Sequence, residues 1–349
     1  MGMLTLRPQT FQAPLSPATA WLLADCMEMR GKQDLWTRQR PETLAALREQ
    51  AIVHSVESSN RIEGVTVAPQ RLRPLALRRT RPRDRSEEEL AGYRKALDWI
   101  FARSSRVAVD QTLILHLHDL AQGGTTGDAG RFKEKDNEII ELKPGVGRVV
   151  RFRPTPAKEA PRAIRELCAS FELLSSERAA PPLLLVATFV FDFLCIHPFR
   201  DGNGRVSRLL TTLLLEREGF VVSQFVSLER LIEDTKEDYY RVLGTCSQRW
   251  SEGRNPIAPW WTYFLSIVRR GYTAFAGKVD RPIAGGTKTE LVRQAAMGQI
   301  GAFALADLRA ELPAVSPQMI RKVLADLRDE GALRSSGRGR AARWEIIRK

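Results

Sequence analysis

The fold is decided by one stretch of the chain, Ile196-His197-Pro198-Phe199-Arg200-Asp201-Gly202-Asn203-Gly204-Arg205-Val206-Ser207-Arg208. An almost unbroken apolar run from Leu183 to Ile196 precedes it, and this run is long enough for a buried helix. Proline cannot continue a helix, so Pro198 ends the run one residue after a single imidazole. We therefore predict that His197 lies at the end of a rigid, buried element in a mainly α fold.

The residues that follow form a loop that suits an anion. Gly202 and Gly204 flank Asn203, and glycines allow a backbone whose N–H groups converge on a phosphate. A second helix follows, and its N-terminus adds the positive end of its dipole. Arg205 and Arg208 are three residues apart on that helix, so their side chains share one face. Together these parts predict a binding site for a polyphosphate.

Two further side chains add chemistry to this loop. Asp201 supplies one hard oxygen ligand, which suits a Mg²⁺ ion that keeps most of its waters and also binds phosphate oxygens. His197 is the nearby group that can accept a proton near neutral pH. The alternative is a glycine loop between two core helices with a solvated arginine face, which leaves the histidine, carboxylate and arginines without a common purpose.

The pattern His-x-Phe-x-Asp-Gly-Asn-Gly-Arg-x-x-Arg resembles the motif of the Fic (Fido-fold) family of AMP-transferases at every motif position. The resemblance implies that the α-phosphate of ATP lies over the backbone of residues 202–204 and that Asp201 holds Mg²⁺. Arg205 and Arg208 would bind the β- and γ-phosphates. His197 would accept the proton of a Tyr, Thr or Ser hydroxyl on a target protein, or on the chain itself. A Fic-like kinase has lysine in place of Gly204, so this glycine favours AMP transfer.

A helix is predicted from Pro41 to Ile62, where apolar residues recur near helical spacing. Its end, Ser59-x-x-x-Glu63-Gly64, resembles the inhibitory helix motif of Fic proteins whose regulator precedes the catalytic domain. In that family the glutamate pairs with the second arginine of the motif, here Arg208, and a carboxylate competes with phosphate for the same guanidinium. The alternative is a surface glutamate at a helix end.

Two short β-branched runs, 138–142 and 148–152, predict a hairpin that must lie on the helical body. The hairpin resembles the Fic flap, which holds a target segment by strand addition. Lys133 departs from the arginine that relatives usually carry just before this flap. By the same resemblance we expect Tyr240 to line the nucleotide pocket, whereas His116 and His118 face different directions on one helix and are expected to be structural.

The last part of the chain resembles a winged helix-turn-helix after a linker at 278–286. Ser316 and Pro317 open its third helix as N-cap and first residue. The module would contact DNA through residues 316–343. Its third helix would present Gln318, Arg321 and Lys322 to the major groove, and Arg338 and Arg340 would reach phosphates. The alternative is a dimerisation or partner-docking module, and three acidic residues weaken the case for DNA: Asp326, Asp329 and Glu330.

The composition of the chain limits the classes of protein to which it can belong. The 349 residues suit two or three domains, and 43% hydrophobic with 27% charged residues are ordinary for a globular protein. We expect a cytoplasmic protein, because no run has the character of a membrane span or signal peptide. The four cysteines are widely spaced, which argues against a zinc site or disulfide framework. The net charge of +13 is concentrated in residues 71–85 and 331–349, and we interpret 71–85 as an exposed connector.

We therefore predict three regions: an N-terminal helical region at 1–85 with the inhibitory helix at about 41–64, a Fic catalytic domain at 86–277, and a winged helix-turn-helix at 287–349. The predicted function is transfer of AMP from ATP, with Mg²⁺, to a hydroxyl of a protein docked on the hairpin at about 138–152. Two alternatives stay open: removal of AMP by the same site, with Glu63 acting on a water, and an ATP-sensing regulator that binds DNA.

Overall fold

The computed structural model describes residues 4–38, 41–104, 107–122, 128–143, 147–279, 288–299, 302–312, 315–337 and 342–347. The chain forms two compact units, Met1–Val279 and Asp280–Lys349. The N-terminal region that we set apart at residue 85 therefore packs in the same unit as the catalytic region. Among the described residues, no helix is both long and apolar enough to cross a membrane.

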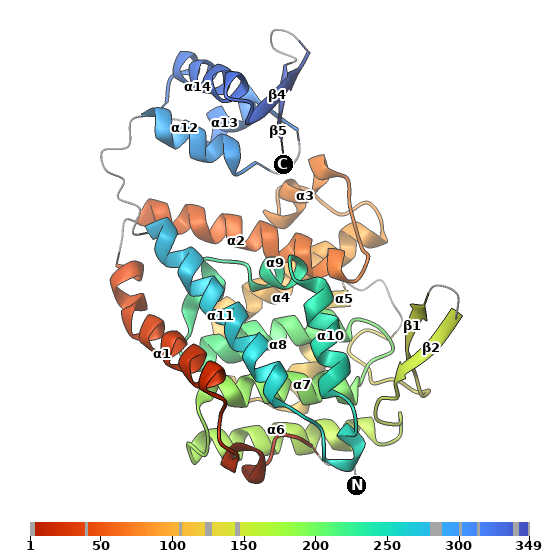
Figure 1. Cartoon of the computed structure of the whole chain (residues 1–349). Helices are drawn as coiled ribbons and strands as arrows, with labels where there is room; N and C mark the ends of the chain where they lie inside the picture. Colours follow the sequence, from red (N-terminus) through yellow and green to blue (C-terminus); the bar gives the residue numbers. More distant parts are fainter. Residues whose placement is uncertain are drawn as a thin grey trace. The chain divides into compact units, whose positions relative to one another are not determined.

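The first unit is built from helices and one hairpin (Figure 1). Its elements are α1 (Pro17–Thr37), α2 (Pro41–Ile62), α3 (Pro69–Ala76), α4 (Arg85–Arg103), α5 (Gln111–Gln122), β1 (Ile139–Lys143), β2 (Gly147–Phe152), α6 (Ala160–Ser176), α7 (Pro182–Ile196), α8 (Asn203–Arg217), α9 (Leu228–Glu233), α10 (Lys236–Cys246) and α11 (Ala258–Val279). The mainly helical fold is thus confirmed.

Helix α7 is the centre of this unit. Its residues are apolar on every side, and it packs against α6, α8 and α11, so nearly all of it is buried. It ends at His197, whose φ of 50° is left-handed and turns the chain before Pro198. Helix α8 begins six residues after His197 and packs against α7, as seen in the middle of the unit in Figure 1. The buried helix, the loop and the second helix are therefore found where the sequence places them.

The arginine-rich stretch differs from our expectation of an exposed connector. Residues 69–76 form α3, and Leu72 and Leu75 are buried on one side of it. Arg71 donates from Nε and Nη2 to the Glu87 carboxylate at 2.7 and 2.6 Å, which ties α3 to α4. The side chain of Asp84 caps α4 by accepting from the Glu87 N–H, and the acidic run from Ser86 lies inside the helix. The prediction is wrong for residues 71–76, where apolar residues at helical spacing lie among the arginines, whereas most of residues 78–85 are exposed, as expected of a connector.

The hairpin is present as predicted. Strands β1 and β2 pair antiparallel, with Ile140 opposite Val150 and Glu141 opposite Val149. The tip of its turn lies outside the described residues. Figure 1 shows the hairpin projecting from the helical body of the first unit, with one edge of the pair uncovered by other elements.

The second unit contains α12 (Lys288–Met297), β3 (Phe303–Ala304), α13 (Leu305–Glu311), α14 (Pro317–Asp329), β4 (Leu333–Ser336) and β5 (Arg343–Ile346). The strands form an antiparallel sheet in the order β3-β5-β4. Ser316 caps α14 by accepting from the Met319 N–H, as predicted. This succession of helices and strands is the one that we expect for a winged helix. Most of the linker and the tip residues Arg338 and Arg340 lie outside the described residues.

One buried carboxylate fastens the N-terminal arm to the centre of the first unit. Asp192 on α7 accepts from the Leu6 N–H and from the Trp250 Nε1–H, each at 2.7 Å. Burial raises the pKa of Asp192 to about 6. Because this folded-state pKa lies above the unfolded value, the stability that the group contributes is largest at low pH and falls as the pH rises through about 6.

Replacement of Asp192 by alanine is expected to lower the free energy of unfolding by about 2–4 kcal/mol, because it leaves buried donors without an acceptor. Urea denaturation at pH 5 and pH 7 measures this loss, which should be larger at pH 5. The matched control is Glu28→Ala on α1, whose exposed pair with Lys32 is expected to contribute little to stability. Equal losses for the two variants would contradict the assigned role of Asp192.

Candidate active site

His197 is held with one ring nitrogen engaged and the other open. Its backbone N–H donates to the Phe193 carbonyl, and its Nδ1 lies 3.3 Å from the Leu194 carbonyl oxygen. A carbonyl can only accept, so Nδ1 carries the proton and Nε2 keeps its lone pair. Burial and, to a smaller extent, the nearby Lys133 ammonium lower the pKa of His197 to about 4. The imidazole is therefore neutral at physiological pH and able to accept a proton at Nε2.

The loop after His197 has the backbone shape of an anion site. Gly202 has a φ of 80° and precedes the first turn of α8, a conformation that glycine adopts without strain. The Asn203 side chain accepts from the Phe199 N–H and donates to the Phe199 carbonyl, which closes the loop on itself. The N–H groups at the start of α8 are thus left to face a ligand.

Asp201 lies at the mouth of this loop with a side chain that is 52% exposed. Its Oδ2 is 3.6 Å from Arg205 Nη2 and 3.9 Å from Arg85 Nη2. No group of three or more His, Cys, Asp or Glu side chains in the described part of the chain could hold a metal ion. A single accessible carboxylate fits Mg²⁺, which binds through one or two carboxylates and substrate phosphates, and does not fit a metal held by protein ligands alone.

The two motif arginines differ in their surroundings. Arg205 is 1% exposed, and its Nη1 donates to Glu89 Oε2 at 2.6 Å while its Nη2 donates to Gln122 Oε1 at 3.3 Å. Glu89 lies on α4, outside the motif, and its side chain is almost as buried. Arg205 is thus already neutralised by a buried carboxylate, a partner that sequence reasoning missed because Glu89 lies in an acidic run that reads as a helix start.

Arg208 makes the contacts predicted for an inhibited site. Its Nε and Nη2 donate to Ser59 Oγ and to the Ser59 carbonyl, each at 2.9 Å, and Nη2 also donates to Glu63 Oε1 at 2.8 Å. Burial alone would lower the pKa of Arg208, but the Glu63 carboxylate raises it above its usual value. The remaining nitrogen, Nη1, is buried and has no hydrogen-bond partner among the described residues. An unpaired buried guanidinium nitrogen marks a place for an anion.

Gly204 is needed because Glu63 lies directly over it. A Cβ at this position would overlap the Glu63 carboxylate and come 3.1 Å from Arg208 Nη1. Gly64, at the end of the α2 turn, has a φ of 82° and lets the chain leave the helix beside the loop. The structure therefore places Ser59 and Glu63 against Arg208 of the motif, the pairing that the family resemblance implies, and Gly64 directly follows this pair in the chain.

A second layer of hydrogen bonds holds α2 against the core. Glu229 is 3% exposed and accepts from the Tyr93 hydroxyl at 2.9 Å and from the hydroxyls of Ser55 and Ser227 at 2.7 and 3.0 Å. These donors come from α4, from α2 and from the cap of α9. Helix α2 is thus fixed by the folded body of the unit, and the Glu63 that follows it meets Arg208 within the same chain.

The flap side of the site carries Lys133 and Tyr240. Lys133 is buried, its N–H donates to the Pro198 carbonyl, and its Nζ donates to Asn137 Oδ1 at 2.8 Å. Burial lowers the pKa of its amine to about 8. Tyr240 is partly buried on α10, with the Arg151 guanidinium 5.8 Å from its ring centroid, whereas its neighbour Tyr239 is buried. Tyr240 thus faces the hairpin, and its contact with a nucleotide stays a prediction.

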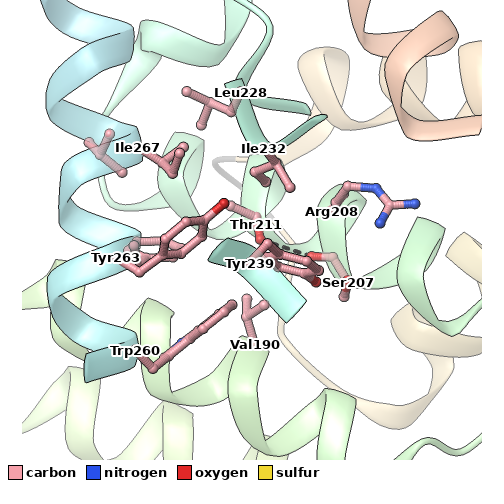
Figure 2. A pocket seen from close by; sticks show the side chains of 12 residues that line it. Val190, Ser207, Arg208, Thr211, Leu228, Ile232, Tyr239, Trp260, Tyr263 and Ile267 are labelled. Atoms are coloured by element: carbon pink, nitrogen blue, oxygen red, sulfur yellow. Dashed lines mark hydrogen bonds between the residues drawn. The ribbon is translucent and has the colours of Figure 1, made fainter. Parts of the chain in front are cut away.

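A cavity of about 20 Å³ lies behind Arg208, between α7, α8, α9, α10 and α11. Figure 2 shows aromatic and aliphatic side chains around it, including Tyr239, Tyr263 and Trp260, and shows the Arg208 guanidinium pointing away from them. This volume holds about one water molecule and cannot hold a nucleotide. The Arg208 guanidinium therefore faces Glu63 and Gly204 and not this cavity (Figure 2).

The fold and the loop together define a helical domain built around a glycine-rich anion loop. Residues 108–215 match the model of the Fic/DOC family. The chain is 25% identical over 207 residues to a protein adenylyltransferase Fic of Nematostella vectensis, which covers 56% of this chain and 43% of the relative. It is 29% identical over 129 residues to a probable protein adenylyltransferase of Aquifex aeolicus, which covers 37% of each chain. The chain thus spans less than half the length of these two curated relatives.

Solved structures agree on the fold. A Fic family protein from Desulfovibrio desulfuricans G20 is 22% identical, with a TM-score of 0.64 over 97% of this chain and 98% of that one. A Fic domain-containing signaling protein from Bacteroides thetaiotaomicron is 20% identical, with a TM-score of 0.61 over 73% of this chain and 97% of that one. This chain therefore has the fold of these Fic proteins, and its residues 108–215 are similar to the Fic/DOC family.

The low pKa of His197 predicts an unusual pH profile for any reaction in which it is the base. The folded-state pKa lies below the ordinary value of about 6.5, so the neutral form persists until the pH falls toward about 4. We expect the acid limb of kcat/KM to lie below pH 5.5. Lys133→Met should move this limb to higher pH by removing a nearby positive charge, while the exposed control Lys135→Met should not. An acid limb at pH 6.5 in all three proteins would contradict the geometry.

Proposed function

We propose that this protein is an adenylyltransferase that transfers AMP from ATP to the hydroxyl of a Tyr, Thr or Ser residue on a target protein, and that Glu63 holds it in an inhibited state. The observation that carries the proposal is the Arg208 guanidinium. It is buried in the core beside the loop, two of its nitrogens are engaged by Ser59 and Glu63, and the third has no hydrogen-bond partner in the described part of the chain. Relatives named protein adenylyltransferases support the same chemistry.

The reaction follows from the parts around the loop. The hydroxyl oxygen attacks the α-phosphorus, its proton passes to His197 Nε2, and the bond from the α-phosphorus to the bridging oxygen of pyrophosphate breaks. The backbone N–H groups at the start of α8 and the Arg208 guanidinium stabilise charge on the phosphates. Mg²⁺ bound at Asp201 would neutralise phosphate oxygens. General base catalysis by His197 contributes roughly 10²–10⁴-fold.

Inhibition is a competition for one guanidinium. The Glu63 carboxylate occupies the face of Arg208 that a γ-phosphate needs, and it covers Gly204. Because the Glu63 side chain is 28% exposed while α2 is tied to the core through Ser55 and Glu229, relief requires movement of the side chain or the last turn and does not require departure of the whole helix.

Glu63→Gly is expected to raise the rate of AMP transfer, because it frees Arg208 for the γ-phosphate. An inhibited state that is favoured by about 3 kcal/mol corresponds to an increase of roughly two orders of magnitude. Incubation with radiolabelled ATP and Mg²⁺ in host lysate, followed by identification of labelled bands, measures transfer to targets and to the protein itself. His197→Ala in the same background should abolish labelling, and the matched control Glu49→Ala, on α2 but paired with Arg73, should behave like the parent.

Failure of Glu63→Gly to increase labelling would remove the inhibitory role. If the Glu63→Gly protein instead lost the ability to release AMP from a modified protein, the alternative reaction, removal of AMP with Glu63 acting on a water, would be favoured. Labelling that persists in the His197→Ala protein would overturn the assignment of the base.

A second candidate function, binding of DNA by the second unit, gains support from its ion pairs. Two of the acidic residues that weaken the case are engaged: Asp329 pairs with Arg328 at 2.8 Å, and Glu330 pairs with Arg293. Arg321 and Lys322 on the exposed face of α14 form no ion pair with any described residue, whereas Ile320, Val323 and Leu324 form the buried face. Arg321 and Lys322 are therefore the basic side chains of α14 that an anionic ligand could reach.

Replacement of Arg321 and Lys322 by alanine is expected to lower the affinity of the full chain for duplex DNA at least about tenfold and to reduce the salt dependence of binding by about two counterions. A gel-shift titration with genomic fragments at several salt concentrations, with and without ATP, measures both. Arg328→Ala, which removes a paired arginine from the same helix, is the control. Absence of binding by the parent, or an equal loss in the control, would reject this candidate.

A further inference from the structure

His118 on α5 joins two parts of the site that the motif does not connect. Its Nδ1 accepts from the Gly130 N–H at 3.0 Å, and its Nε2 lies 3.1 Å from the Asp201 carbonyl oxygen. An N–H can only donate and a carbonyl can only accept, so Nδ1 must be bare and Nε2 must carry the proton. Both nitrogens of one imidazole are therefore used, one toward the start of the flap segment and one toward the anion loop.

Two neighbours complete this arrangement, which we call the His118 bracket and define as His118, Gln122 and Phe199. The His118 ring stacks on the Phe199 ring with centroids 3.7 Å apart and planes 3° from parallel. Gln122, one turn further along α5, donates from Nε2 to the same Asp201 carbonyl at 3.4 Å and accepts from Arg205 through Oε1. Two donors from one helix thus converge on the backbone of Asp201.

These contacts to the Asp201 main chain matter because few other interactions hold the Asp201 side chain. Its Oδ1 accepts only from the adjacent Gly202 N–H, at 2.6 Å, among the hydrogen bonds of the described residues, and its Oδ2 faces two guanidinium groups at 3.6 and 3.9 Å. The half-exposed carboxylate is therefore oriented through its main chain. Hydrogen bonds in the second layer of a metal site commonly orient the ligands in this way.

We propose that His118 is a positioning residue that sets the Asp201 main chain through Nε2 and ties it to the flap segment through Nδ1. The proposal rests on the proposed function, in which Asp201 binds Mg²⁺ with ATP. In this arrangement the flap segment and the metal-binding carboxylate share one rigid connection, because Gly130 precedes the residues 131–137 that lie against Pro198 and Phe199. His116, two residues away, packs edge-to-face against Trp99, and no hydrogen bond of the described residues joins its side chain to the loop.

The test uses the full chain with Glu63→Gly and His197→Ala, a background that should bind nucleotide without transferring AMP. Binding of ATP is measured by titration calorimetry over a range of Mg²⁺ concentrations and again without Mg²⁺. Three substitutions separate the hydrogen bond to Asp201 from the hydrogen bond to Gly130. His118→Phe keeps an aromatic ring and removes both bonds. His118→Gln keeps a donor that reaches toward Asp201, and His118→Asn keeps an acceptor for Gly130. His116→Phe is the matched control.

We expect His118→Phe and His118→Asn to raise the Mg²⁺ concentration needed for half-maximal enhancement of ATP binding about tenfold or more, with ATP binding in the absence of Mg²⁺ unchanged. His118→Gln should stay within about threefold of the parent, and His116→Phe should match it. If His118→Phe does not fold, as judged by its thermal melt, the Asn and Gln variants decide the question.

An unchanged Mg²⁺ requirement in His118→Asn would overturn the proposal. An equal loss of ATP binding with and without Mg²⁺ would also overturn it, because that result indicates a general structural role. Neither outcome depends on AMP transfer, since the background lacks the base. Failure of the proposed function is seen separately, as absence of labelling by the Glu63→Gly protein that retains His197.

Discussion

The site depends on one buried positive charge. Arg208 is 3% exposed and lies in a core formed by α2, α8 and α10, where an unpaired cation is costly. The protein must therefore provide an anion at this place at all times, and the chain offers Glu63 when no phosphate is present. The inhibitory contact and the proposed substrate contact are thus two solutions to the same electrostatic requirement.

The surrounding fold makes this exchange local. Ser59 accepts from Arg208 through both its hydroxyl and its carbonyl oxygen, and these two bonds do not use the carboxylate. Replacement of Glu63 by a phosphate would therefore leave Arg208 oriented. The Glu229 network fixes α2 from behind, so the exchange involves a partly exposed side chain on a fixed helix. A guanidinium held in this way is already in position for its ligand.

Much of this site could be predicted from the sequence because its parts are close in the chain. The apolar run before His197 and the glycines after Asp201 fix a buried helix, a loop and a second helix by local rules, and the structure confirms these elements. Ser59 and Glu63 lie some 145 residues before Arg208, and their contact was inferred from a family resemblance, since no periodicity or spacing indicates such a distant pairing.

What the sequence could not predict are partners set by packing. Glu89 reads as part of an acidic helix start, yet its side chain is buried against Arg205. His118 reads as a helical histidine of structural type, yet both its nitrogens are committed to main-chain groups of the site. The short helix α3 was missed because arginines dominate its composition, and only the burial of Leu72 and Leu75 shows which face packs.

The different environments of the two motif arginines imply different tasks in the proposed reaction. Arg205 has a buried carboxylate partner in Glu89, so a phosphate at Arg205 meets a guanidinium whose charge is already balanced. Arg208 has a partner that is partly exposed and can leave, so its charge becomes available only when Glu63 moves. In the proposed reaction, the fixed pair of Arg205 and Glu89 shapes the loop, and the exchangeable pair of Arg208 and Glu63 controls whether a phosphate can bind. A single motif thus combines a structural arginine with a regulated one, and the difference arises from which carboxylate the fold places beside each.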